Sequence, residues 1–169
     1  CTPDLTYSVV SEPDDPFYNT TSGSWGQSYA DLWGLKIMNT PKAWNSSVGG
    51  GITVAVVDTG LDTEHPDIAA NLWANPLEIP GNGLDDDGNG VVDDVHVADF
   101  TAVSAANLAS GVVIDPNGHG THVAGTIAAV ANNGEGIVGV SPGVKVMPVR
   151  GLDAAGLGSS STLMPAIMY

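Results

Sequence analysis

Asp58 is the first residue whose type and position suggest chemistry. It directly follows an apolar, β-branched run at residues 52–57 and directly precedes Thr59-Gly60. Because the carboxyl ends of parallel strands face the ligand crevice of an α/β sheet, a carboxylate at this point can fix the tautomer of a nearby histidine and stabilise its charged form. The alternative is a structural aspartate that caps the following turn, and Asp58 by itself does not decide between the two.

His119 and His122 lie three residues apart at the start of a second apolar segment, Asn117-Gly-His-Gly-Thr-His-Val-Ala-Gly125. In a helix this spacing would place two metal ligands on one face. The His-Glu-x-x-His pattern is absent, because only two residues separate the histidines and neither is Glu. The residues alone leave metal binding, proton transfer and a structural role open. Gly125 is expected to let the helix pack closely against a neighbour.

An acidic segment at residues 85–94 has the pattern of a calcium-binding loop. Oxygen-bearing side chains stand at positions 1, 3, 5 and 9 of an EF-hand-like loop, with Gly90 at position 6 and His96 instead of Glu at position 12. A hard divalent cation would offset the repulsion among five aspartates in ten residues. The alternative is a solvated acidic loop. The predicted ligands are Asp85, Asp87, Asn89 and Asp93.

The segments that must position these residues alternate between strand and helix. Residues 52–57 and 145–150 resemble buried strands, and residues 119–130 are apolar nearly all round, as expected of a buried helix. A final helix is expected at residues 159–169. Strand, helix, strand and helix predict an α/β fold with a mostly parallel sheet.

The remaining segments are less regular. Residues 1–31 are rich in Pro, Ser and Asp, and we expect an N-terminal arm that packs through its aromatic residues, which include Tyr7, Tyr18 and Trp25. A short helix is expected within residues 31–44. Residues 61–118 are expected to form a long loop that is functional or stiffened by something other than a core.

Composition excludes several kinds of partner. The 169 residues have a formal net charge of −15, so phosphates of nucleic acid or of an anionic membrane would be repelled. With 43% hydrophobic residues the chain can form a core, yet no apolar run approaches the roughly 20 residues that span a bilayer. The single cysteine, Cys1, permits no internal disulfide.

Considered together, two segments carry a family resemblance. Val54-Ala-Val-Val-Asp58-Thr-Gly60 and the segment around His119 resemble the Asp and His blocks of the subtilisin-like serine proteases, in that family's order. Shorter matches lie at residues 14–18, 33–35, 39–44, 65–67 and 139–142. The resemblance implies a three-layer subtilisin-like fold and a serine endopeptidase, with Asp58 as the orienting carboxylate, His119 as general base and acid, and His122 as a structural neighbour.

The third member of the family's triad is not found in this sequence. Subtilases carry their nucleophile in a Gly-Thr-Ser-Met-Ala block downstream of the histidine, and no such block occurs here. We therefore expect residues 32–169 to be the N-terminal part of a catalytic domain, incomplete at its C-terminus and inactive alone. The competing hypothesis is a catalytically inactive subtilase-like module that binds calcium or peptides. A dinucleotide-binding domain is disfavoured, because Gly-x-Gly-x-x-Gly does not follow the first strand.

The resemblance also implies a peptide-binding segment between the second strand and the final helix. In the family this backbone pairs with the substrate as an added strand. An ordinary glycine turn is the alternative, and Gly151 departs from the apolar residue usual in the family. The predicted substrate-binding residues are Leu152, Gly156, Leu157 and Gly158.

A second calcium site is implied by resemblance only. Side chains of Asp15, Asp67 and Asn133 match its ligands, completed by backbone carbonyls of Val130, Glu135 and Ile137. Ca²⁺ is therefore the expected cofactor. Peptides and proteins are the expected substrates, an inhibitory propeptide is a further candidate partner, and secretion is the expected localisation. A lipid anchor on Cys1 is disfavoured against an arbitrary fragment boundary.

Overall fold

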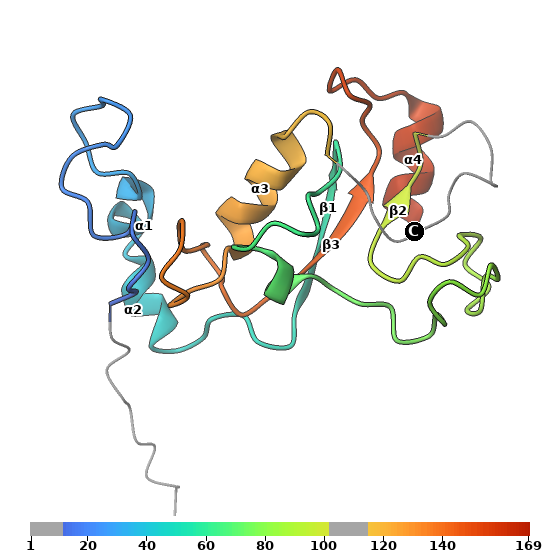
Figure 1. Cartoon of the computed structure of the whole chain (residues 1–169), viewed down its shortest axis with the longest axis horizontal. Coiled ribbons are helices and arrows are strands. Elements are labelled where there is room, and N and C mark those ends of the chain that lie inside the picture. The colour runs from blue at the N-terminus through green and yellow to red at the C-terminus, as the bar shows by residue number, and fades with distance from the viewer. Residues whose placement is uncertain (1–11, 102–114) are drawn as a thin grey trace, which may run out of the picture.

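The computed structural model describes residues 12–101 and 115–169, in which short helices and strands alternate as the sequence predicts (Figure 1). The predicted strand at residues 145–150 is found with those bounds, and the other strand is displaced by one residue. In chain order the elements are α1 Trp33–Ile37, α2 Thr40–Trp44, β1 Thr53–Asp58, the 3₁₀ turn η1 Ala69–Asn71, β2 Ala98–Asp99, α3 His119–Ala128, β3 Lys145–Arg150 and α4 Ser160–Met168.

The sheet is parallel throughout the described residues, with β3 between β1 and β2. Thr53 pairs with Lys145 at one end of the β1–β3 ladder and Asp58 with Arg150 at the other. Valine and threonine dominate β1, and their branched side chains favour the extended backbone. The predicted α/β class and parallel pairing are confirmed.

The two faces of the sheet are covered by different helices, which makes three layers (Figure 1). Val56 and Val146 pack with Ala124 and Ala128 of α3 in one core cluster. Val149 lies in a second cluster with Ala166 of α4. Because side chains alternate between the faces of a strand, residues 146 and 149 point to opposite layers.

The N-terminal segment packs against the body through one buried aromatic residue. Tyr18 is 1% exposed and lies in a cluster with Leu35, Trp44 and Val138. Phe17 stacks on Trp25, which is 74% exposed. The expected aromatic packing is therefore confirmed for Tyr18 but not for Trp25, and Tyr7 lies outside the described residues.

The region expected to hold one short helix contains two. Asn39 separates α1 from α2 and adopts a left-handed backbone with φ of 57°. A residue in that conformation cannot continue a right-handed helix, so the chain changes direction there. Trp44 closes α2 against the body, and its indole N–H donates to the carbonyl of Val140 at 2.9 Å.

Between β1 and α3, the described part of the long loop contains only η1 and β2. Carboxylate and amide side chains accept many of its backbone N–H groups. Leu61, Ile68, Val91 and Ala98 of this loop also lie in the buried core clusters, so the expectation that something other than a core stiffens it is met only in part. Within the described residues, no helix combines the length and apolarity needed to cross a bilayer.

Candidate functional site

Asp58 and His119 come together where β1 ends and α3 begins. His119 Nδ1 lies 2.7 Å from Asp58 Oδ1 and 2.9 Å from Oδ2. Since a carboxylate only accepts hydrogen bonds, Nδ1 carries the proton and Nε2 is left as the basic nitrogen. The carboxylate side chain is 11% exposed and the imidazole 63%. The exposed ring can therefore take a proton from another group while the buried acid orients it.

The backbone around Asp58 is held on both sides. Its carboxylate Oδ1 accepts the N–H of Thr59 at 2.7 Å. Its main-chain carbonyl accepts the N–H groups of Gly151 and Leu152, each at 3.0 Å. The end of β1 is thus joined to the chain that leaves β3, and Asp58 has a defined position at this edge of the sheet.

The close approach of α3 to the end of β1 and the loop after it depends on Gly120, whereas the sequence predicts close packing of the helix at Gly125. A methyl group on Gly120 would lie 2.2 Å from the carbonyl oxygen of Gly60. On Gly125 it would meet, among the described residues, Ile68 and Ile137 alone, at 3.8 and 3.9 Å. The expectation for Gly125 is wrong, because that position of α3 faces side chains with room for a methyl group.

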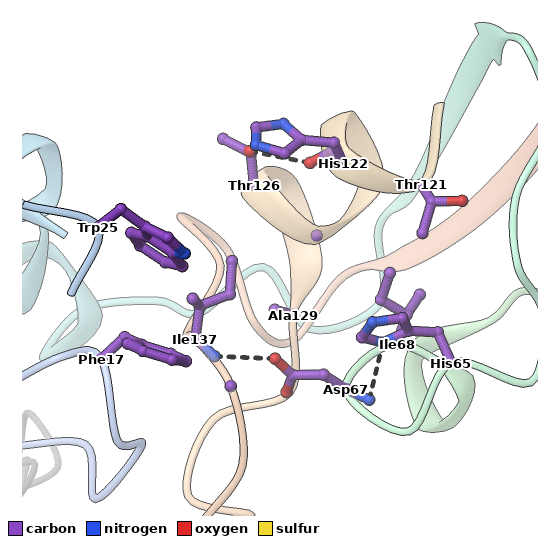
Figure 2. Close-up of a pocket in the computed structure, with 12 residues that line it drawn as sticks. Phe17, Trp25, His65, Asp67, Ile68, Thr121, His122, Thr126, Ala129 and Ile137 are labelled. Carbon is purple, nitrogen blue, oxygen red and sulfur yellow. Dashed lines mark hydrogen bonds between the residues drawn. The ribbon is translucent and has the colours of Figure 1, made fainter. Parts of the chain in front are cut away.

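His122 lies one turn along α3 from His119, in a separate pocket of about 370 Å³. Figure 2 shows the pocket between α3 and the N-terminal segment, with Phe17 and Trp25 opposite His122. Among the residues that the structure describes, neither histidine of α3 belongs to a group of three potential metal ligands. The geometry favours proton transfer at His119 over a two-histidine metal site.

The predicted substrate-binding residues lie between β3 and α4, in a turn closed by Asp153. Asp153 Oδ1 accepts the N–H groups of Ala155 and Leu157, each at 2.9 Å. Gly156 has a left-handed φ of 76°. Asn117, two residues before the catalytic candidate His119, donates its side-chain N–H to the carbonyl of Ala154 at 3.0 Å. The turn is therefore attached to the histidine end of α3.

The side chains of this turn differ in burial. Leu157 is 69% exposed and lines a cavity of about 290 Å³ with Gly158. Leu152 lies close to Gly158, because a methyl group added to Gly158 would lie 2.7 Å from Leu152 Cδ2. A methyl group on Gly151 would lie 3.0 Å from Cδ2 of Leu163 in α4, which occupies the space a side chain would need. Glycine at 151 is thus explained by packing, and the adjacent strand ladder is intact.

Two buried carboxylates face the loop at residues 130–137. Asp67 accepts the N–H of Ile137 at 2.9 Å and the side-chain N–H of Asn133 at 2.9 Å. Asp15 Oδ2 accepts the N–H of Asn132 at 3.0 Å, while its Oδ1 is buried and has no partner among the described residues. An unpartnered buried carboxylate oxygen is costly unless something compensates its charge, which is what a cation at this loop would do.

The other predicted members of this site lie on the same loop. The N–H of Val130 donates to the main-chain carbonyl of Asp67 at 2.8 Å. The N–H of Glu135 donates to Asn133 Oδ1 at 3.0 Å. The structure therefore gathers the predicted set around one loop, with the Asn133 amide group turned to donate to Asp67.

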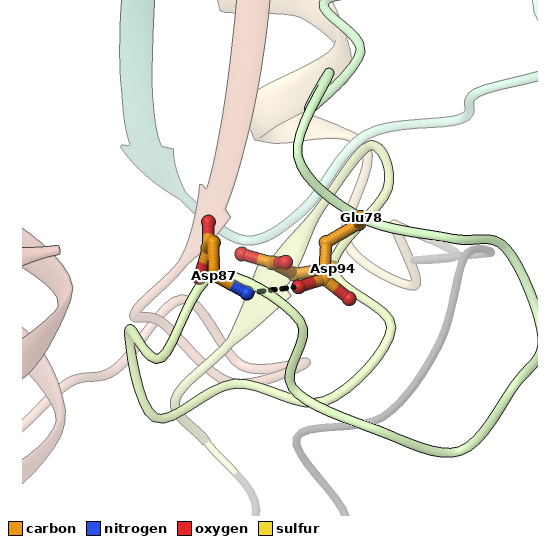
Figure 3. Close-up of side chains that lie close together, drawn as sticks. All are labelled: Glu78, Asp87 and Asp94. Atoms are coloured by element: carbon orange, nitrogen blue, oxygen red, sulfur yellow. Dashed lines mark hydrogen bonds between the residues drawn. The ribbon is translucent and has the colours of Figure 1, made fainter.

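In the acidic loop, the carboxylates that lie close together are not the same set as the calcium ligands predicted from the sequence. Oxygen atoms of Glu78, Asp87 and Asp94 all lie within 4.8 Å of one another, and Figure 3 shows these side chains close together. Glu78 Oε2 is buried without a partner among the described residues. Asp94 is fully buried and accepts a hydrogen bond from the hydroxyl of Tyr169, which directly follows α4. Burial and this bond raise the pKa of Tyr169.

The remaining predicted ligands of the acidic loop hold turns. Asp85 accepts backbone N–H groups of residues 88, 89 and 90, and Asp93 accepts those of Asn82 and Gly83. Asn89 donates its side-chain amide to Asp87 at 3.2 Å and to Asp94 at 2.8 Å. Sequence reasoning missed Glu78 and Asp94. Asp94 belonged to the acidic run, whereas nothing in the spacing indicated Glu78.

Fold and site define an α/β protein with a carboxylate–imidazole pair at the carboxyl edge of a parallel sheet. The particular family follows from comparison with known proteins. The sequence pattern of the peptidase S8 subtilase family matches residues 49–168, and the chain belongs to the subtilase family. The resemblance inferred from the two motif blocks is therefore confirmed.

Several relatives are peptidases by name. Subtilisin-like protease 1 of Plasmodium vivax is 40% identical over 156 residues, which cover 89% of this chain and 24% of that protein. An extracellular protease of Xanthomonas campestris pv. campestris is 42% identical over 78% of this chain and 22% of its own length. An intracellular serine protease of Paenibacillus polymyxa is 35% identical over 80% of this chain and 34% of its own length. The chain thus spans about a third or less of each.

Proposed function

We propose that this chain supplies the acid and the base of a serine endopeptidase triad, with Asp58 as the orienting acid and His119 as the general base. The observation that carries the proposal is the 2.7 Å contact between His119 Nδ1 and Asp58 Oδ1, with the imidazole open to solvent. Family membership supports a serine peptidase as the activity of the complete protein. Because the sequence contains no Gly-Thr-Ser-Met-Ala block, we place the nucleophile elsewhere in that protein.

In the proposed mechanism His119 Nε2 accepts the proton of the serine hydroxyl as the hydroxyl oxygen attacks the peptide carbonyl carbon. The imidazolium that forms is stabilised by the Asp58 carboxylate through the Nδ1 proton. His119 then donates the proton from Nε2 to the leaving amine. Negative charge develops on the carbonyl oxygen during the attack and requires preorganised hydrogen-bond donors. We propose that the complete protein supplies these donors.

The substrate is proposed to be a peptide that lies along the turn between β3 and α4. Leu152, Gly156, Leu157 and Gly158 are the residues assigned to it. The exposed side chain of Leu157 beside its cavity supports an apolar contact there, and the bond from Asn117 to Ala154 brings the turn close to the catalytic pair. Of Gly156 and Gly158, Gly156 is the less hindered to an approaching backbone, because a side-chain nitrogen of Asn117 is the one described atom within 4 Å of its missing methyl group.

Calcium is the proposed cofactor at two places. The first is the loop at residues 130–137 with Asp15 and Asp67, where a buried carboxylate oxygen lacks a partner among the described residues. The second is the acidic loop, where Glu78 and Asp94 join Asp87 as the favoured ligands. Carboxylate oxygens are the ligands that Ca²⁺ prefers, and neither ion pair among the described residues involves these groups. Bound calcium would stabilise the folded chain by mass action.

Secretion is proposed for the complete protein, with an inhibitory propeptide as a candidate partner. The names of the relatives include both an extracellular and an intracellular protease, so they do not decide the compartment. The proposal rests instead on the acidic loop, because calcium sites of this kind are filled most readily where calcium is abundant.

Labelling of the complete protein with a fluorophosphonate probe tests the proposed activity. We expect labelling and peptide hydrolysis in the wild-type protein, and the loss of most turnover in His119→Ala. His122→Ala, a change of the other histidine on the same helix, which lies in a different pocket, is the matched control and should affect mainly stability. Absence of labelling in folded wild-type protein would favour the inactive calcium- or peptide-binding module instead.

A further inference from the structure

Asp115 lies just before α3 and accepts an unusual number of hydrogen bonds for one carboxylate. Its Oδ1 accepts the hydroxyl of Thr59 at 2.7 Å and the N–H of Gly118 at 2.9 Å. Oδ1 also lies 3.2 Å from the N–H of Asn117. Its Oδ2 accepts both the N–H and the hydroxyl of Thr121, each at 2.8 Å. Both oxygens are therefore bound to groups that lie close to the catalytic pair.

Thr59 connects this carboxylate to the catalytic pair. It is fully buried, and its side-chain hydroxyl donates to Asp115 and accepts the N–H of Gly120 at 2.9 Å. The main-chain N–H of Thr59 donates to Asp58 Oδ1 at 2.7 Å. An uninterrupted series of bonds thus runs from Asp115 through one threonine to the carboxylate that orients His119, and it spans the junction of β1 and α3.

The charge state of Asp115 suits this role. Burial alone would raise its pKa, but the bonds from Thr121, Thr59 and Gly118 outweigh burial and lower the pKa to about 2. The carboxylate is therefore ionised at neutral pH and offers acceptors only. An amide at this position would turn an NH₂ group toward at least two donors, so asparagine cannot reproduce the bonds.

We propose that Asp115 is a positioning residue that acts through Thr59 to hold Asp58 and the N-terminus of α3 in register for proton transfer. The proposal rests on the proposed peptidase function, because it concerns the same pair. Among the bonds of the described residues, Asp115 contacts neither the imidazole nor the turn assigned to the substrate. Its effect is thus expected on the rate of the chemical step more than on substrate binding.

The kinetic test compares variants of the complete protein well below their melting temperatures. Asp115→Asn and Thr59→Val should each lower kcat by about 10- to 100-fold, the range expected when catalytic groups are displaced by up to about 1 Å, with KM changed less than about twofold. Thr59→Ser keeps the hydroxyl and should retain most of the activity. Asp31→Asn is the control, since the Asp31 carboxylate also accepts backbone and side-chain bonds, which among the described residues come from Ser24 and Gln27 in its own segment.

Comparison of the double variant of Asp115 and Thr59 with the two single variants distinguishes a positioning role from general destabilisation. If Asp115 acts through Thr59, the double variant should lose little more activity than either single variant. Multiplied losses, an unchanged kcat in Asp115→Asn, or equal effects of Asp115→Asn and Asp31→Asn would overturn the proposal.

A measurement that needs no turnover keeps this inference separate from the proposed function. In NMR spectra of ¹⁵N-histidine-labelled protein, the hydrogen-bonded Nδ1 proton of His119 is assigned by its loss in His119→Ala. It should be observed in the wild type and in Asp31→Asn. In Asp115→Asn it should exchange with water too fast to be observed. A protected Nδ1 proton in Asp115→Asn refutes the positioning role even if the wild type hydrolyses peptides. Absence of turnover with the expected proton behaviour refutes the peptidase function alone.

Discussion

Replacement of Gly120 by alanine should separate β1 from α3 at the proposed catalytic pair, Asp58 and His119. The new methyl group would lie 2.2 Å from the carbonyl oxygen of Gly60 and 3.2 Å from Asp58 Cβ, whereas ordinary contacts begin at 3.4 Å. The obstructing atom is backbone, so relief requires a displacement of 3.4 − 2.2 = 1.2 Å between the helix and the loop after β1. Such overpacking costs about 1–3 kcal/mol, offset in part by about 1 kcal/mol from replacing a helical glycine with alanine.

The displacement should affect catalysis more than stability. A shift of about 1 Å between reacting groups costs about 100-fold in rate, so Gly120→Ala is expected to lower kcat about 100-fold and the free energy of unfolding by up to about 2 kcal/mol. Gly125→Ala, in the same helix, adds a methyl group with contacts of 3.8 and 3.9 Å and should gain about 0.5–1 kcal/mol.

Peptide turnover and thermal unfolding of the complete protein, measured for both variants, provide the assay. Equal kcat and equal melting temperature in Gly120→Ala and Gly125→Ala would refute the displacement, since the contact with Gly60 would then impose none.

Three further predictions concern calcium, substrate and pH. Excess chelator should lower the melting temperature of the complete protein, and Asp67→Asn and Glu78→Gln should each reduce that sensitivity; an identical melting curve with and without chelator contradicts the calcium proposal. Leu157→Ala should reduce kcat/KM about tenfold more for peptides with large apolar residues before the scissile bond than for peptides with small ones, a difference of the size that lost apolar contacts produce. Equal losses across a peptide series contradict the assignment of Leu157 to the substrate site. The pKa of Asp115 is about 2 in the folded chain and about 3.9 in the unfolded chain, so its contribution to stability is complete above the unfolded value and is lost as the pH falls through the folded value. The melting temperature of the wild type should therefore fall between about pH 5 and 2, and Asp115→Asn should make this fall shallower. An equal fall in the variant contradicts the lowered pKa.

The regular elements near the site could be predicted from local sequence because their signals are local. The strand at residues 145–150 consists mainly of residues that favour an extended, buried backbone, and its bounds agree with the structure. The helix that begins at His119 is two residues shorter than the sequence predicts. Ala129 leaves the helical conformation with ψ of 141° although its N–H still bonds to Gly125, and composition contains no signal for that change.

Elements whose limits depend on backbone conformation or on distant contacts were predicted less well. The division between α1 and α2 results from one left-handed residue, Asn39, which the pattern of residues 31–44 does not reveal. The glycine that allows close packing is Gly120 and not the predicted Gly125, because the obstructing carbonyl of Gly60 is 60 residues away in the chain. Sequence spacing within a helix cannot report such a neighbour.

The sequence by itself determined the candidate catalytic residues and the family. Asp58 and His119 each stand in a short motif that joins a strand or helix end to a glycine turn, and such motifs are complete within a few residues. Only the tertiary structure decided which side chains surround them. Glu78 joins Asp87 and Asp94, and Asp115 reaches Thr59, because folding brings together groups that are separated by up to 56 residues. Buried carboxylates persist in such places only where donors or a cation compensate their charge, and that compensation is a property of three-dimensional contacts.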